Sequence, residues 1–79
     1  MPVTTSDLGT AIADFTKRPA PTLNESDTLT SLHLDSLALL EIISTVEYRF
    51  SIQVDEDDLV DLKNVSDLLR VLNKAPKRN

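Results

Sequence analysis

The side chains most capable of chemistry gather in one short stretch, L-H-L-D-S-L-A, from Leu32 to Ala38. His33, Asp35 and Ser36 are the residue types that hydrolases combine as base, orienting acid and nucleophile. Hydrolases normally bring such groups together from distant chain positions, whereas here they are near neighbours. The stretch also lacks the G-x-S-x-G turn that exposes a nucleophilic serine in many hydrolases. We therefore expect that the chain is not an enzyme and that Ser36 has another use.

A run of acids, from Asp55 to Asp58, is the second candidate site, because carboxylates are preferred ligands of calcium. A calcium loop starting at Asp55 would need Gly at the position of Val60 and Glu at the position of Ser66. Neither residue is present. The run instead suits the start of a short helix, where acids are favourable. We expect no metal site.

Length and composition limit the protein to a small single domain. The chain has 79 residues and no Cys, so neither disulfides nor thiolate zinc sites can stabilise it. We expect one domain over residues 1–79, with its core at about 5–73 and a flexible tail at 74–79. No apolar run approaches the roughly 20 residues that cross a bilayer, and the start does not read as a signal peptide. The sequence therefore predicts a cytoplasmic monomer that does not enter membranes.

Negative charge is concentrated in the middle of the chain. The net charge is −5, but residues 19–69 hold 11 acids against 2 bases. An acidic centre repels nucleic-acid phosphates and attracts basic protein surfaces. We expect no nucleic-acid binding, although acids that only keep a small protein soluble would give the same composition.

Apolar spacing predicts helices rather than strands. A first helix is expected from about Ser6 to Thr16, with Leu8, Ile12 and Phe15 on its core face and Thr5 or Ser6 as its cap. The long connection at 19–34 contains several leucines, so we expect it to pack over the other elements.

The strongest apolar stripe predicts a second helix at about 36–50. A short third helix is expected at about 55–61. The last helix should begin at Asn64, whose spacing from Asp67 resembles a capping box. The predicted fold class is all-α: a four-helix bundle with three main helices, a short third helix and a long loop between the first and second.

Ser36 has an ordinary structural explanation as well as a functional one. Asp35 or Ser36 could cap the second helix by accepting backbone N–H bonds that the first turn cannot satisfy internally. The tripeptide D-S-L alone does not distinguish the structural explanation from the functional one.

The wider context of that tripeptide resembles the acyl carrier protein family. The segment D-T-L-T-S-L-H-L-D-S-L (27–37) resembles the family's approach to its modified serine. A-L-L-E-I-I-S-T-V-E-Y-R-F (38–50) resembles the family's second helix, V-D-E-D-D-L (54–59) its third, and N-V-S-D-L-L-R-V-L (64–72) its fourth. The resemblance runs from the first helix through Leu72.

The resemblance implies that Ser36, flanked by Asp35, is joined through Oγ to 4′-phosphopantetheine from coenzyme A. A separate phosphopantetheinyl transferase would attach the group, whose thiol would carry an acyl chain as a thioester. The positive end of the second helix would favour its phosphodiester. The chain would then be a shuttle and a substrate of other enzymes.

The resemblance also implies partner docking on the second helix. Leu37 and Leu40 match apolar contact positions, and Asp35, Glu41 and Glu47 match acids that face basic patches on loading or adenylating enzymes, acyltransferases and synthases. The alternative is that Leu37 and Leu40 are core residues.

Several positions depart from the family pattern. His33 stands where Gly is usual, so the backbone before Ser36 could bend differently, and the imidazole could lie near the phosphate or remain idle. Ala38, Ser44 and Tyr48 make the docking helix less acidic than in fatty-acid carriers. We therefore expect a carrier of polyketide or nonribosomal peptide biosynthesis. The alternatives are the carrier of fatty-acid synthesis and an unmodified helical adaptor, and the carried group is not specified by the sequence.

Overall fold

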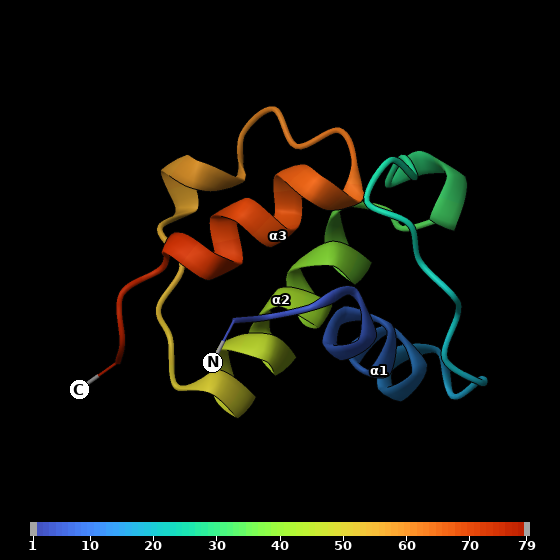
Figure 1. The fold of residues 1–79 in the computed structure, drawn as a ribbon, viewed down its shortest axis with the longest axis horizontal. Helices are drawn as coiled ribbons and strands as arrows, with labels where there is room; N and C mark the ends of the chain where they lie inside the picture. Colours follow the sequence, from blue (N-terminus) through green and yellow to red (C-terminus); the bar gives the residue numbers. More distant parts are fainter. Residues whose placement is uncertain (1, 79) are drawn as a thin grey trace.

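The computed structural model describes residues 2–78, which form three α-helices and two 3₁₀-helices and no extended sheet (Figure 1). The elements in chain order are α1 (Thr5–Thr16), η1 (Thr30–Leu32), α2 (Ser36–Phe50), η2 (Glu56–Leu59) and α3 (Val65–Lys74). The predicted all-α fold, with a short third helix and a long first loop, is confirmed. The short third helix is η2, a 3₁₀-helix. Within the described range, no helix has both the length and the apolar character needed to cross a membrane.

The start of α1 differs slightly from the prediction. Thr4, rather than Thr5 or Ser6, is the N-cap. The Asp7 N–H donates to Thr4 Oγ1 at 3.2 Å, and the Thr4 N–H donates to the Asp7 carboxylate at 2.9 Å. This reciprocal pair is a capping box with Asp in the place of the usual Glu, so the helix begins one residue earlier than expected.

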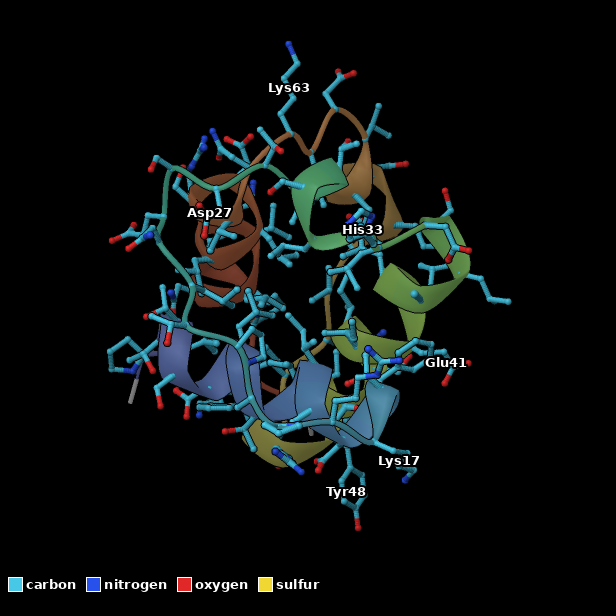
Figure 2. The ribbon with its side chains drawn as sticks, turned by 90° about the vertical axis from the view of Figure 1, so that its right-hand side faces the viewer. Lys17, Asp27, His33, Glu41, Tyr48 and Lys63 are labelled. Atoms are coloured by element: carbon cyan, nitrogen blue, oxygen red, sulfur yellow. The ribbon has the colours of Figure 1, made fainter. Side chains whose placement is uncertain are left out.

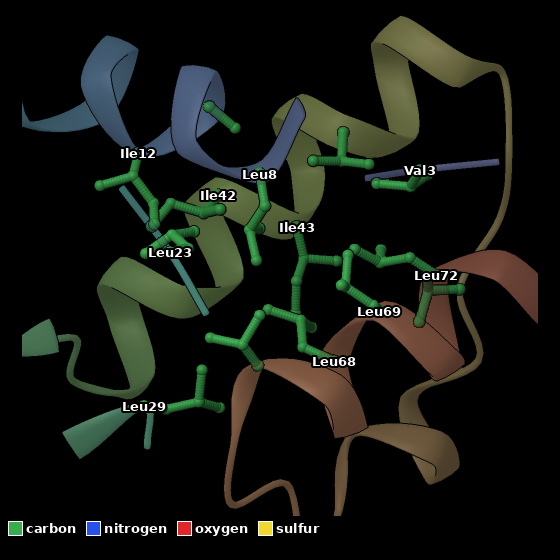
Figure 3. Packing of buried hydrophobic residues seen from close by; sticks show 14 of the residues in the cluster. Val3, Leu8, Ile12, Leu23, Leu29, Ile42, Ile43, Leu68, Leu69 and Leu72 are labelled. Carbon is green, nitrogen blue, oxygen red and sulfur yellow. The ribbon is translucent and has the colours of Figure 1, made fainter. Parts of the chain in front are cut away.

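The core draws on every helix and on the connections between them (Figure 3). Its largest fully buried side chains come from α1, α2 and α3: Leu8, Ile42, Leu68, Leu72, Val46 and Val65. Leu39 and Phe50 of α2 are half-buried against this cluster, as the apolar stripe predicted. Apolar packing across the three helices therefore holds the molecule together.

Phe15 was predicted to belong to the core, and this was wrong, because its side chain is 43% exposed. It lies on the same face of α1 as Leu8, Ala11 and Ile12, which are buried, but one turn further along. Lys17 then turns the chain away in a left-handed conformation, with φ of 61°. Phe15 therefore lies on the buried face of α1, as predicted, but beyond the last turn of the helix whose side chains are buried.

The long first connection is fastened to the start of α3. The Leu29 N–H donates to the Lys63 carbonyl at 2.9 Å, and the Val65 N–H donates to the Asp27 carbonyl at 2.9 Å. Leu23 and Leu29 are buried, and Leu32 and Leu34 are half-buried. The expectation that this loop packs over the helices is confirmed. Its last residues lead directly into α2, so the anchoring of the loop positions the start of that helix.

The two ends of the described chain are also held by hydrogen bonds. Near the N-terminus, the Asn73 side chain accepts from the Val3 N–H at 2.6 Å and donates to the Val3 carbonyl at 3.0 Å. Val3 is buried, so the core extends beyond the predicted 5–73. Near the C-terminus, the Arg78 N–H donates to the Ser51 carbonyl at 2.7 Å. Flexibility of residues 74–79 stays a prediction, and residue 79 lies outside the described residues.

Asp67 makes the start of α3 sensitive to acid. Its carboxylate accepts N–H bonds from Lys63 and Asn64 at 3.1 and 3.2 Å and lies beside the Arg70 guanidinium. The two backbone bonds, and then Arg70, lower the pKa of Asp67 below the ordinary value of 3.8. A lowered folded-state pKa stabilises the fold above 3.8, and this stabilisation is lost as the pH falls through the folded-state value.

We therefore predict that Asp67→Asn lowers the free energy of unfolding at neutral pH and has a progressively smaller effect as the pH falls below 3.8. Urea unfolding of both proteins across this pH range would measure the difference. Glu41→Gln is the control, because it removes the same charge from an exposed residue of α2 that has no ion-pair partner among residues 2–78. A difference that stays constant across the pH range would contradict the assignment.

Candidate functional site

The first turn of α2 is capped by Asp35 and not by Ser36. Asp35 has extended backbone angles, and its Oδ1 accepts the Ala38 N–H at 2.8 Å. The Asp35 carbonyl accepts the Leu39 N–H at 2.9 Å, which is the first backbone bond of the helix. Ser36 is therefore the first helical residue. The choice between cap and function that the sequence left open is decided against a capping role for Ser36.

Ser36 is free to react at the open end of a 15-residue helix. Its side chain is exposed, and its hydroxyl makes no hydrogen bond to any other described residue. The N–H groups of Ser36 and Leu37 are likewise without a backbone acceptor in this part of the chain, because the first turn of a helix offers none. These N–H groups and the helix dipole give the site a partial positive charge. The arrangement therefore suits a hydroxyl that receives an anionic group.

The backbone before Ser36 contains a left-handed residue. His33 has φ of 59° and ψ of 34°, and its N–H closes η1 by donating to the Thr30 carbonyl at 3.0 Å. Glycine is the usual residue for such angles, but His is among the residues that adopt them more often than most. His33 thus takes a conformation in which Gly would be ordinary, so the exchange requires no different bend of the chain. Its imidazole is exposed, lies near the start of α2 (Figure 2) and makes no hydrogen bond within residues 2–78.

An exposed face of α2 continues from Ser36 toward the other end of the helix. Leu37 and Leu40 are 69% and 50% exposed, so the alternative that they are core residues is wrong. Glu41 is exposed between them and Tyr48, which is 81% exposed, and Figure 2 shows both of these side chains pointing away from the helices. We call Leu37, Leu40, Glu41 and Tyr48 the α2 face. Exposed apolar side chains beside an acid are typical of a protein-binding surface.

Glu47 lies two turns beyond Leu40 on α2 and has a structural contact. It is half-buried, and its carboxylate accepts the Val54 N–H at 2.8 Å. Its carbonyl also accepts the Ile52 N–H at 3.1 Å. Glu47 therefore holds the connection from α2 to η2, and a role in docking stays a prediction for this residue. Leu37, Leu40 and Glu41 are exposed together near the start of α2, whereas Glu47, two turns beyond Leu40, is half-buried and bonded to the Val54 N–H.

The sequence reasoning overlooked a groove between the end of α1 and the start of α2. Phe15 and Ile12 form one wall, and Leu32, His33 and Leu34 form another, around a volume of about 440 Å³. The signal that could have indicated it is the sequence F-T-K-R-P, in which Phe15, the last residue of the apolar stripe, comes directly before the end of the helix and Pro19. We call this feature the α1–α2 groove.

A family model described as "Phosphopantetheine attachment site" matches residues 6–72. The chain belongs to this family. The prosthetic group of the family is 4′-phosphopantetheine, and the chain is an acyl carrier protein in the broad sense of that family. The Ser36 hydroxyl is exposed, does not cap the helix, and lies beside the N–H groups of Ser36 and Leu37 that have no backbone acceptor. These features fit the attachment of such a phosphodiester.

Curated relatives and a solved structure agree with this membership. The chain is 26% identical to the meromycolate extension acyl carrier protein of Mycobacterium tuberculosis, across 100% of this chain and 73% of that protein. It is 34% identical to the acyl carrier protein of Chlamydia trachomatis across 63% of this chain and 65% of that one. The solution NMR structure of a holo acyl carrier protein from Geobacter metallireducens shares the fold, with a TM-score of 0.76, 24% identity, and coverage of 94% of this chain and 85% of that one.

The capping geometry predicts unequal effects of two neighbouring substitutions on stability. Asp35→Ala removes the bond to the Ala38 N–H and should lower the free energy of unfolding by about 1 kcal/mol. Ser36→Ala should change it by less than about 0.5 kcal/mol, since an exposed first helical residue tolerates Ala. Urea unfolding of the unmodified proteins measures both values. If Ser36→Ala lowered the free energy of unfolding as much as Asp35→Ala does, the result would indicate that Ser36 caps α2.

Proposed function

We propose that Ser36 carries the 4′-phosphopantetheine group and that the chain is a discrete acyl or aminoacyl carrier in polyketide or nonribosomal peptide biosynthesis. The observation that supports the site most directly is the exposed Ser36 hydroxyl. It is not needed as a cap, because Asp35 caps α2. When bound, the group supplies a thiol that holds an acyl chain as a thioester. The chain itself presents the cargo to other enzymes and does not act as the catalyst.

The modification step defines what Ser36 and its surroundings do. Ser36 Oγ forms a bond to the phosphorus of coenzyme A that bears the pantetheine, and the bond from that phosphorus to the bridging oxygen breaks. The nucleotide bisphosphate leaves, and the serine proton passes to a base on the transferase. The helix N–H groups of Ser36 and Leu37 favour the negative charge that the phosphodiester brings.

The α2 face is the proposed docking surface for partner enzymes. Leu37 and Leu40 provide apolar contacts beside the modified serine, and Glu41 provides a negative charge for a basic patch on the partner. Such a charge mainly accelerates and orients the encounter. A small surface of this kind supports brief binding, as a shuttle requires.

The assignment to specialised metabolism rests on the weak charge of the α2 face. Tyr48 of that face and the neighbouring Ser44 are exposed and uncharged, Ala38 is buried and lies outside the face, and Glu41 is the acid of the face. A role in fatty-acyl synthesis is the second candidate, because a relative aligned over the whole of this chain is named for meromycolate extension.

We predict that incubation with coenzyme A and a broad-specificity phosphopantetheinyl transferase raises the intact mass by one phosphopantetheine group. Ser36→Ala should abolish the gain, and Ser44→Ala, which changes another exposed serine of α2, should retain it. No gain in the wild type would support an unmodified adaptor. An undiminished gain in Ser36→Ala would place the group elsewhere.

Docking through the α2 face predicts that Glu41→Lys slows loading by a partner enzyme without lowering stability, because Glu41 is exposed and has no ion-pair partner among residues 2–78. Glu25→Lys makes the same charge change in the first connection and is the matched control. Loading rates at low salt, where charge steering is strongest, measure the effect. Equal rates for the two variants would remove Glu41 from the docking surface.

The two pathway candidates predict different enzymatic acceptance of the modified protein. Purified holo protein would be offered to fatty-acid elongation enzymes and, separately, to adenylating or specialised acyltransferase enzymes. We expect efficient loading only by the second group. Repeated elongation by the fatty-acid enzymes would overturn the preferred pathway while leaving the carrier assignment intact.

A further inference from the structure

The α1–α2 groove has walls of apolar side chains that remain open to solvent. Phe15 on one side is 43% exposed, and Leu32 and Leu34 on the other side are half-buried. The volume of about 440 Å³ falls in the range of pockets that hold organic groups. Exposed aromatic side chains are enriched at surfaces that bind other proteins. The groove therefore offers a place for an apolar group from outside the chain.

The shape of the groove is held by the first connection. Two of its lining residues are Pro19 and Pro21, whose rings fix the backbone angle φ. The connection also lies close against α1, since a Cβ at Gly9 would be 3.1 Å from the Pro21 carbonyl oxygen. Two residues later, Leu23 is buried in the core. A wall held in this way has little conformational freedom to lose when a ligand binds, so the groove is preorganised.

The charge of the groove is opposite to that of the whole chain. The net charge is −5 and the chain has 13 acids, yet none of the described residues that line the groove is Asp or Glu. Arg18 and His33 are among those residues. Arg18 and the neighbouring Lys17 are exposed and have no ion-pair partner among residues 2–78. Because a guanidinium binds carboxylates through paired N–H donors, the groove complements an anionic group that lies beside an apolar one.

The acidic remainder of the molecule limits which anion can approach. Nucleic acids carry a phosphate at every nucleotide, and residues 19–69, with 11 acids against 2 bases, repel such a polyanion. An anionic membrane surface is repelled for the same reason and is normally bound by clusters of basic residues. A protein segment with one carboxylate beside an apolar side chain needs only one cation and one apolar groove. Arg and aromatic residues are also the types that protein interfaces favour.

We propose that the α1–α2 groove is a protein-docking site in addition to the α2 face. It binds an apolar side chain of a partner protein, and Arg18 pairs with a carboxylate next to that side chain. The charge that the groove requires of a partner is opposite to the charge that Glu41 of the α2 face requires. Binding at the groove does not depend on Ser36 or on its modification. A partner that uses both surfaces would therefore be oriented by two charges of opposite sign.

The test titrates the unmodified full chain with the acetylated and amidated peptide G-E-L-F-G and follows the backbone amide resonances by NMR. We expect the amides of Phe15, Leu32 and Leu34 to shift most and to saturate at millimolar peptide. The peptides G-Q-L-F-G and G-K-L-F-G are the controls. They should bind the groove more weakly, although the net charge of −5 would by itself favour the peptide with Lys. Absence of these shifts with G-E-L-F-G, or equal or tighter binding of either control, would overturn the proposal.

A matched pair of variants tests the ion pair separately. Arg18→Ser should weaken the binding of G-E-L-F-G about threefold, the effect of one exposed ion pair, and leave the binding of G-Q-L-F-G unchanged. Arg78→Ser removes the same side chain from an exposed residue outside the groove and should leave the binding of both peptides unchanged. Equal weakening in the two variants would show a long-range effect of net charge and would contradict the pairing with Arg18.

Discussion

The hydrogen bond from the Ala38 N–H to the Asp35 carboxylate determines how α2 begins, and the candidate site depends on that beginning. Because Asp35 is the cap, Ser36 enters the helix as its first residue, with a hydroxyl that the fold does not use. The same turn leaves two N–H groups without acceptors. One local bond therefore both exposes the nucleophile and prepares a positive environment for the phosphate that it would receive.

That turn is held in place by contacts made far from it. The first connection is hydrogen-bonded to the start of α3 through Leu29 and Val65, and its leucines pack into the core. His33 completes the approach by adopting a left-handed conformation that closes η1 just before Asp35. Moving the site would thus require breaking backbone bonds in the loop and exposing apolar surface, so the position of Ser36 is a property of the whole fold.

The three α-helices and the core stripe of α2 were predictable because apolar spacing and capping patterns are local in sequence. Phe15 was misplaced because spacing gives the face of a residue but not where the neighbouring helix ends. Glu47 was assigned only to docking because its bond to the Val54 N–H depends on how the chain turns after α2. The D-S pair allowed either residue to cap, and the backbone angles together with the bond from the Ala38 N–H distinguish Asp35 from Ser36.

The most direct measurement compares the backbone amide resonances of the protein before and after modification with coenzyme A. If the first turn of α2 receives the phosphodiester, the amide protons of Ser36 and Leu37 should shift downfield more than any others in α2, because they gain an anionic acceptor. The Asp35–Ala38 bond should persist, with the Ala38 amide changing little. Large shifts elsewhere in the chain, with Ser36 and Leu37 unchanged, would contradict this account of the site.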